Sequence, residues 1–285
     1  MKNLIKSAIV FIASTLSFTA NAQTAKDENS LLWEISGKGI EKSSYLYGTI
    51  HMICENDFFM KEKVIKAFEK TSKLALEINI TDANEINYMQ KSLMGTTPLT
   101  KTLTPSQAKE LNEILEKTAG MTLNQVNNYT MATVMGLITM KSFGCANIKS
   151  YEMEFIAKAK ATNMKVIGLE KAKEQLDFLN NAYTNQELIS MLKEMTNEET
   201  KKDVEYYKQE DISNIYINGT DKKVMNEKIK SFMLDKRNNN WFVTMPEIMQ
   251  KEPVFFAIGA AHLSGEQGII NLLRKAGYTV KPILN

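Results

Sequence analysis

The sequence predicts an α/β fold in which helices flank a central β-sheet and a helical segment occupies the middle of the chain. Short apolar runs of strand-like composition occur in the first third of the chain, near residue 165 and near the C-terminus, and helical patterns separate them. Residues 100–141 instead show helical patterns without such runs. Strands that alternate with helices are typical of an α/β protein.

The first predicted strands cover residues 31–37 and 44–50, and a short turn that contains two glycines joins them. A helix with one apolar face is expected from about Asp57. Residues 74–80 then alternate large apolar side chains with smaller or polar ones, as a strand does. Strand, helix and strand over this length predict a βαβ unit with a parallel pair of strands.

The middle of the chain is predicted to be helical. Thr104 caps a helix that starts at Pro105 and runs to about Thr118. The apolar segment 123–141 is expected to form one long buried helix. Residues 184–249 are expected to form amphipathic helices, because lysines and glutamates alternate there as on solvated faces.

Two further passages of strand and helix complete the predicted sheet. The expected elements are a helix over 151–161, a strand over 165–169, a helix over 171–180, a strand over 254–258, a helix over 264–276 and a strand over 278–283. Ser264 and Gln267 have the spacing of a capping box at the start of the last helix.

The first residues have the layout of a secretory signal peptide. Lys2 and Lys6 precede an apolar run over residues 8–18, and Ala20 and Ala22 place small side chains at a cleavage site. The alternative is an uncleaved N-terminal anchor, although the run is short for a membrane-spanning helix. We therefore predict residues 1–22 as a signal peptide and residues 23–285 as a single exported domain, periplasmic or secreted.

The charge balance excludes two classes of partner. The chain has 35 basic and 33 acidic residues, and removal of the two lysines in residues 1–22 leaves 33 of each. A neutral, mixed surface is not typical of a protein that binds nucleic acid or an anionic membrane. A protein or peptide partner and a homodimer both stay open.

Two cysteines, Cys54 and Cys145, are too few for a disulfide framework. In an oxidising compartment they can pair with each other or stay free. Cys54 lies three residues after His51, so a role as a metal ligand is the less favoured alternative.

The two histidines of the chain stand in matching contexts. His51 ends the motif Gly48-Thr49-Ile50-His51, and His262 ends Gly259-Ala260-Ala261-His262. Each motif follows an apolar strand, and ligands of α/β proteins bind beyond the carboxyl ends of strands. We therefore predict that His51 and His262 share one site, whereas either histidine alone would be read as satisfying a local backbone hydrogen bond.

The helix expected from Ser264 adds to this interpretation. A helix N-terminus disfavours the charged imidazolium, and so keeps a nearby His262 neutral and able to bind a metal. Small residues at 259–261 allow the backbone to approach a bound group closely.

Carboxylates are needed to complete a metal site. Glu77 is the best candidate, because it is a lone carboxylate in an apolar strand that we expect next to the His51 strand. Alternatively, Glu77 lies with Asn79 on a half-exposed polar face of the strand and has no role in a site. Glu170 ends another apolar strand, and Arg237 is unremarkable by spacing alone. Signatures of serine hydrolases, nucleotide-binding loops and His-Glu-x-x-His metalloproteases are absent from the sequence.

Together these motifs resemble the TraB/GumN family, which includes the Tiki metalloproteases. The paired Gly-x-x-His motifs and the segment GAAHLSGEQGIINLLRKAGYTV carry most of the resemblance. Further matches are YLYGTIH, LALEI with Glu77, VIGLEKAKEQ with Glu170 and Gln175, and KRNNNW with Arg237, Asn238 and Trp241. Glu152 stands where the family often has an aspartate, and Lys171 where it commonly has a threonine.

The resemblance implies a central mixed β-sheet with helical additions, related to erythromycin-esterase-like and ChaN-like proteins. It also implies a divalent-metal hydrolase, because Tiki members act as peptidases supported by manganese or cobalt.

In our hypothesis His51, His262 and Glu77 bind a manganese, cobalt or zinc ion that lowers the pKa of a bound water. Glu77 or Glu170 accepts the proton of that water. Arg237 stabilises the developing negative charge or binds a carboxylate of a peptide substrate. The alternatives are an esterase-like hydrolase, a non-catalytic protein that binds haem or a metal, and histidines with a purely structural role.

Overall fold

The computed structural model describes residues 29–284, so the predicted signal peptide, residues 1–22, lies outside the described residues. Six strands form one sheet in the order β6-β4-β7-β2-β1-β8. These strands are β1 (Leu32–Ser36), β2 (Ser44–Thr49), β4 (Lys73–Ile78), β6 (Lys165–Glu170), β7 (Val254–Gly259) and β8 (Thr279–Pro282). Strands β6, β4, β7 and β2 are parallel, and β1 is antiparallel to both β2 and β8. The α/β fold with a central mixed sheet is confirmed.

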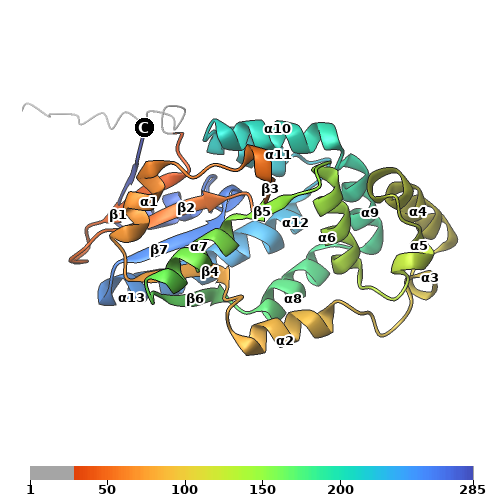
Figure 1. Cartoon of the computed structure of the whole chain (residues 1–285), viewed down its shortest axis with the longest axis horizontal. Coiled ribbons are helices and arrows are strands. Elements are labelled where there is room, and N and C mark those ends of the chain that lie inside the picture. Colours follow the sequence, from red (N-terminus) through yellow and green to blue (C-terminus); the bar gives the residue numbers. More distant parts are fainter. Residues whose placement is uncertain (1–28, 285) are drawn as a thin grey trace, which may run out of the picture.

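Helices surround the sheet and continue into a helical region at the other end of the molecule (Figure 1). Near the sheet lie α1 (Glu62–Glu69), α7 (Tyr151–Ala161), α10 (Asn197–Lys208), α11 (Ile212–Gly219), α13 (Lys236–Lys251) and α14 (Ile269–Lys275). The remaining helices are α2 (Ala83–Ser92), α3 (Leu99–Thr102), α4 (Pro105–Ala119), α5 (Leu123–Val126), α6 (Met131–Ser142), α8 (Ala172–Ala182), α9 (Asn185–Glu194) and α12 (Glu227–Lys230). One hydrophobic core contains the sheet, and a second joins α3, α4, α5, α6 and α9.

The predicted pairing of the first two parallel strands is wrong. Strands β2 and β4 are parallel, but β7 lies between them and pairs with both. All six residues of β7 are buried, and this wholly apolar strand can fill the centre of the sheet. The strand that bears Glu77 is therefore separated from the strand that precedes His51 by the strand that precedes His262.

The expected long helix over 123–141 is also wrong, because the chain breaks it into α5 and α6. Thr130 caps α6, since its hydroxyl accepts a hydrogen bond from the backbone N–H of Thr133. Asn127 bonds back to the start of α3 through both its carbonyl and its side chain. Asparagine and threonine side chains compete with helical hydrogen bonding, which explains the interruption.

The last helix starts later than expected, and the capping box at Ser264 and Gln267 does not form. Helix α14 begins at Ile269 with Gly268 at its N-cap. A short 3-10 turn over Ala260–His262 precedes it, and Gly265 adopts a positive φ of 89°. A Cβ on Gly268 would lie 2.3 Å from the carbonyl oxygen of Ser264, so the tight turn requires glycine there. The first helix of the chain is late as well: α1 starts at Glu62, not near Asp57.

A second, two-stranded sheet lies between the main sheet and the helical region (Figure 1). Strands β3 (Met52–Cys54) and β5 (Ile148–Ser150) are antiparallel in it. A disulfide joins Cys54 to Cys145 across 91 positions of sequence. The cysteines therefore pair with each other and tether the segment after His51 to the segment before Glu152.

Every helix within residues 29–284 is too short or too polar to span a lipid bilayer.

Candidate functional site

Three neighbouring strands bring the predicted residues together. Strands β2, β7 and β4 are parallel neighbours, so their carboxyl ends lie at one edge of the sheet. His51 and His262 follow the first two of these strands, and Glu77 lies near the end of the third. The Oε1 atom of Glu77 is 3.7 Å from Nε2 of His51 and 4.0 Å from Nε2 of His262. The pattern of strand ends thus places both histidines around one carboxylate.

Glu152 and the backbone hold the ring of His51. The residue has a φ of 56°, in the left-handed region that residues other than glycine seldom adopt. Its Nδ1 lies 2.8 Å from Oε1 of Glu152, an atom that also accepts a hydrogen bond from the hydroxyl of Thr49. Ser150 donates to the other oxygen of Glu152. With Nδ1 engaged by a carboxylate, Nε2 is the atom that faces Glu77.

His262 is held from the opposite side by helix α13. Its Nδ1 lies 2.6 Å from Oδ1 of Asn238, whose amide nitrogen donates to the carbonyls of His262 and Gln267. Because the amide oxygen can only accept, Nδ1 of His262 carries the proton and Nε2 has a free lone pair. The ring of Trp241 packs 4.5 Å from that of His262, centroid to centroid.

The glycines of the two motifs have separate structural roles. A Cβ on Gly259 would lie 3.1 Å from Nε2 of His51 and 3.2 Å from Oε1 of Glu77. The backbone N–H of Gly259 also donates to that oxygen at 2.8 Å. A Cβ on Gly48 would instead meet the backbone of Ala260 at 3.0 Å. Gly259 therefore keeps open the space between the histidines and the glutamate, and Gly48 lets the two motifs pack against each other.

Arg237 joins the site carboxylates. It lies in α13, is only 4% exposed, and uses all five of its N–H groups. Its Nε and Nη2 donate to Glu170, and Nη2 also donates to Oε2 of Glu77 at 2.5 Å. Its Nη1 donates to the carbonyl of Met233 and lies 3.2 Å from Nε2 of His262. Gln175 bridges both carboxylates, and Trp241 donates to Glu170.

These contacts separate the protonation states of the two histidines. Partial desolvation would lower the pKa of His51, whose side chain is 52% exposed, but the carboxylates of Glu77 and Glu152 raise it to about 9. Burial and the neighbouring Arg237 lower the pKa of His262 to about 3. Burial would raise the pKa of Glu77, but Arg237 and both histidines hold it well below its ordinary value. At neutral pH the site therefore contains a protonated His51, a neutral His262 and an ionised Glu77.

Burial raises the pKa of Glu170, and Arg237 opposes that shift. Both oxygens of Glu170 accept hydrogen bonds from Arg237. The Nη2 atom of Arg237 and the Nε2 atom of Gln175 each contact both carboxylates, so Glu170 lies beside Glu77. Lys171 lies outside this group, because its ammonium is 3.3 Å from Glu85 of α2.

The chemical types of the donor atoms in His51, His262 and Glu77 suit a divalent cation. Two imidazole nitrogens and a carboxylate are common ligands of zinc, manganese and cobalt, at about 2.0–2.2 Å for zinc. The empty Cβ position of Gly259 leaves room beside all three side chains. As placed, however, no three His, Cys, Asp or Glu residues in 29–284 are close enough together to hold a metal. The contact of Arg237 with Nε2 of His262 competes for the same lone pair.

Sequence patterns did not reveal the residues that orient the histidines. In the sequence, only the family resemblance points to Glu152, Asn238 and Trp241. Each lies on a helix far from the histidines in sequence and follows no spacing rule. A polar residue in an apolar helix face is the signal that points to Asn238, which is 2% exposed.

Comparisons with known proteins match one family model and two named relatives. The TraB/PrgY/gumN family model matches residues 31–282. Metalloprotease TIKI1 of Danio rerio is 23% identical over 90% of this chain and 63% of its own length. Metalloprotease TIKI2 of the same fish is 22% identical over 90% of this chain and 61% of its own length. The chain thus spans less than two thirds of these relatives, and no solved structure matches it.

Proposed function

Because this chain belongs to the TraB/PrgY/gumN family, we propose that it is an exported, metal-dependent peptidase whose site is built from His51, His262 and Glu77. The observation that carries the proposal is the convergence of two Nε2 atoms on Oε1 of Glu77, with each Nδ1 held by a separate partner. Histidine ligands of metals are oriented in this way by a hydrogen bond at the other ring nitrogen. The two metalloprotease relatives support a peptide substrate.

The residues have distinct roles in this proposal. His51, His262 and Glu77 would hold a manganese, cobalt or zinc ion, which when bound would supply a water of lowered pKa and polarise the scissile carbonyl. Oε1 of Glu77 faces the histidines and would be either a ligand of the ion or the acceptor of the water proton, because Arg237 and Gln175 bind Oε2. Glu170 is a positioning residue, because its oxygens bind Arg237 and Trp241. One Nη1 proton of Arg237 is directed at Nε2 of His262. This proton would lose its acceptor when Nε2 binds the metal, and it could then meet developing negative charge.

We expect one added methyl group to block the site. Gly259→Ala leaves the backbone unstrained, since its φ is −54° and its ψ 134°, but puts a carbon between His51 and Glu77. Titration calorimetry with Mn²⁺, Co²⁺ and Zn²⁺ should show one ion per wild-type chain and an affinity about 10–100-fold lower in Gly259→Ala. Cleavage of a peptide library should fall in parallel.

Gly136→Ala is the matched control for this variant. Gly136 lies in α6, and a Cβ there would meet no atom within 4 Å. Its metal affinity should equal that of the wild type. Equal affinities for the wild type and Gly259→Ala would place the ion elsewhere and refute the proposed site. Haem binding without any hydrolysis would favour the non-catalytic alternative.

Metal binding should release one proton per ion near neutral pH. His51 is protonated there, because its pKa is about 9, whereas His262 is already neutral with a pKa of about 3. A cation and a proton compete for His51, so the affinity should rise about tenfold per pH unit between pH 6 and 8. Calorimetry in two buffers with different ionisation enthalpies measures the proton count. A binding enthalpy that does not depend on the buffer would contradict the proposed ligand.

A further inference from the structure

Two cavities adjoin beside the candidate site. The first, with a volume of about 260 Å³, is lined by both histidines, Gly259, Tyr207 and Ile215, and we call it the histidine cavity. The second, of about 350 Å³, is lined by residues that include Tyr183, Met191 and Met225, and we call it the outer cavity. Asp203 and Gly219 line both cavities. The two cavities therefore lie next to each other, and the outer cavity lies between α9, α10 and α11.

The outer cavity is acidic. Four carboxylates line it, from Glu194, Glu199, Asp203 and Asp221, against two ammonium groups, from Lys202 and Lys223. Lys202 is paired with Glu199 at 3.6 Å. This excess of negative charge favours a cationic group in a ligand over an anionic one.

Asp203 is the carboxylate at the junction of the cavities. Asn218 donates to its Oδ1 at 2.6 Å, and within the described part of the chain Asp203 has no ion pair with a lysine, arginine or histidine. It is partly buried, and this burial raises its pKa. A carboxylate in such a position is stabilised by a cation that approaches through the cavity.

The geometry points to a substrate with a basic side chain: we propose that the peptide lies along both cavities and that a lysine or arginine next to the scissile bond binds Asp203. This inference rests on the proposed peptidase function and names its substrate class. The apolar lining of Ile215, Tyr183 and Met225 would contact the aliphatic part of that side chain and its neighbours.

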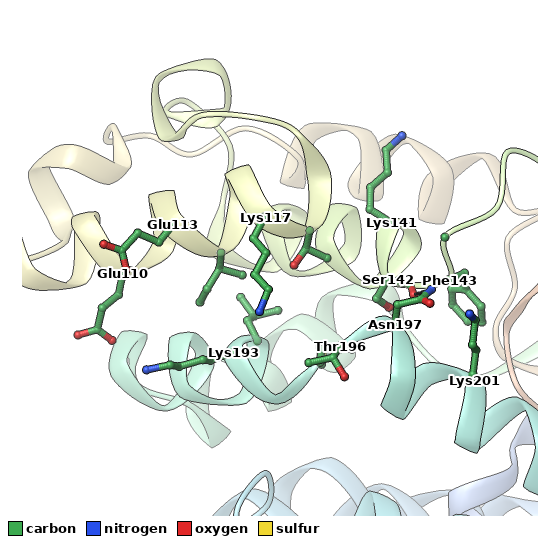
Figure 2. Close-up of a pocket in the computed structure, with 15 residues that line it drawn as sticks. Glu110, Glu113, Lys117, Lys141, Ser142, Phe143, Lys193, Thr196, Asn197 and Lys201 are labelled. Atoms are coloured by element: carbon green, nitrogen blue, oxygen red, sulfur yellow. Dashed lines mark hydrogen bonds between the residues drawn. The ribbon is translucent and has the colours of Figure 1, made fainter.

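A third cavity, of about 510 Å³, does not compete with this assignment. It lies between α4, α6, α9 and the start of α10, and none of the candidate site residues lines it (Figure 2). Lys117, Lys141, Lys193 and Lys201 line it, but Figure 2 shows Lys141 extending away from the other lining side chains. These lysines do not converge on a common point.

Matched peptide pairs test the proposal, each pair differing only by lysine or norleucine at one position. For the pair in which the varied residue reaches Asp203, the wild type should give a kcat/KM about tenfold higher for the lysine peptide than for the norleucine peptide. This is the ratio expected for a hydrogen bond to a charged group. Asp203→Asn should bring that ratio to about one. Glu205→Gln removes the same charge from an exposed residue of α10 that pairs with Lys208, and should keep the ratio. A ratio near one in the wild type, or an unchanged ratio in Asp203→Asn, would overturn the inference.

Binding of the same peptides, measured by fluorescence anisotropy without added metal, separates this inference from the function. If the wild type binds the lysine peptide preferentially and Asp203→Asn abolishes that preference, the role of Asp203 in substrate binding is supported even if no peptide is cleaved. In that case only the peptidase proposal fails. Gly219→Leu gives a second variant, because a Cβ at Gly219 meets no atom within 4 Å. It should weaken binding of both peptides, whereas Gly136→Leu should not. Cleavage with no lysine preference in either assay leaves the peptidase proposal standing and overturns the inference.

Discussion

Replacement of Arg237 by methionine is expected to lower the free energy of unfolding by about 3–5 kcal/mol at pH 7. Arg237 is the cation that joins Glu77 and Glu170, and all three side chains are buried. Without it, Glu170 stays buried with no compensating charge, and Glu77 keeps only the protonated His51 at 3.7 Å. Removal of one partner from a buried ionic group costs more than the group itself contributes, because the remaining charge cannot be solvated.

The cost of this substitution should depend on pH. Without Arg237 the pKa values of Glu77 and Glu170 in the folded state rise above their values in the unfolded chain. The destabilisation is therefore complete at pH values above the raised pKa values and is relieved as the pH falls through them. Urea unfolding of Arg237→Met and the wild type at pH 7 and pH 5 measures this pH dependence. The difference in the free energy of unfolding between the two proteins should be smaller at pH 5.

Lys251→Met is the matched control, because Lys251 lies on the same helix in an exposed pair with Glu247. It should change the free energy of unfolding by less than about 0.5 kcal/mol. A similar small change in Arg237→Met, at either pH, would show that the carboxylates do not need the arginine.

The order of elements was predictable because each strand has its own local pattern. The wholly apolar run of β7 and the apolar residues around Glu77 in β4 identify buried strands without knowledge of their partners. Their order in the sheet was not predictable in this way, since both β2 and β4 could pair with each other or with β7. Only the packing of the complete chain places β7 at the centre, and that packing also brings Glu77 to His262.

In the candidate site, too, some residues were predictable from local sequence patterns and others depend on how the whole chain packs. Paired motifs after apolar strands identified His51 and His262, because strand ends have a known relation to binding sites. Glu77 was suggested by its isolation in an apolar strand. Glu152 and Asn238 act through the second ring nitrogen of each histidine, and this depends on how α7 and α13 pack against the sheet. No spacing along the chain encodes such a contact.

Removal of the disulfide should have an effect as large as that of Arg237→Met. The bond between Cys54 and Cys145 closes a loop of 91 positions, and the chain-entropy account assigns about 4–5 kcal/mol to a loop of this length. Cys54→Ser/Cys145→Ser should therefore unfold at a distinctly lower urea concentration than the oxidised wild type. Reduction of the wild type with dithiothreitol should lower its midpoint to that of the variant, while the variant itself should not respond.

The same variant should bind metal more weakly, because the disulfide holds the segments that carry His51 and its partner. Met52, next to His51, pairs with Ser150, whose hydroxyl donates to Glu152. Loosening this short sheet would release Glu152 from Nδ1 of His51, and loss of such a partner typically costs 10–100-fold in metal affinity. Glu152→Gln in the oxidised protein isolates that contribution, since it leaves the covalent tether in place. If the variant without cysteines loses stability but binds Mn²⁺ as tightly as the wild type, the strand pairing alone positions His51, and the disulfide serves only the fold.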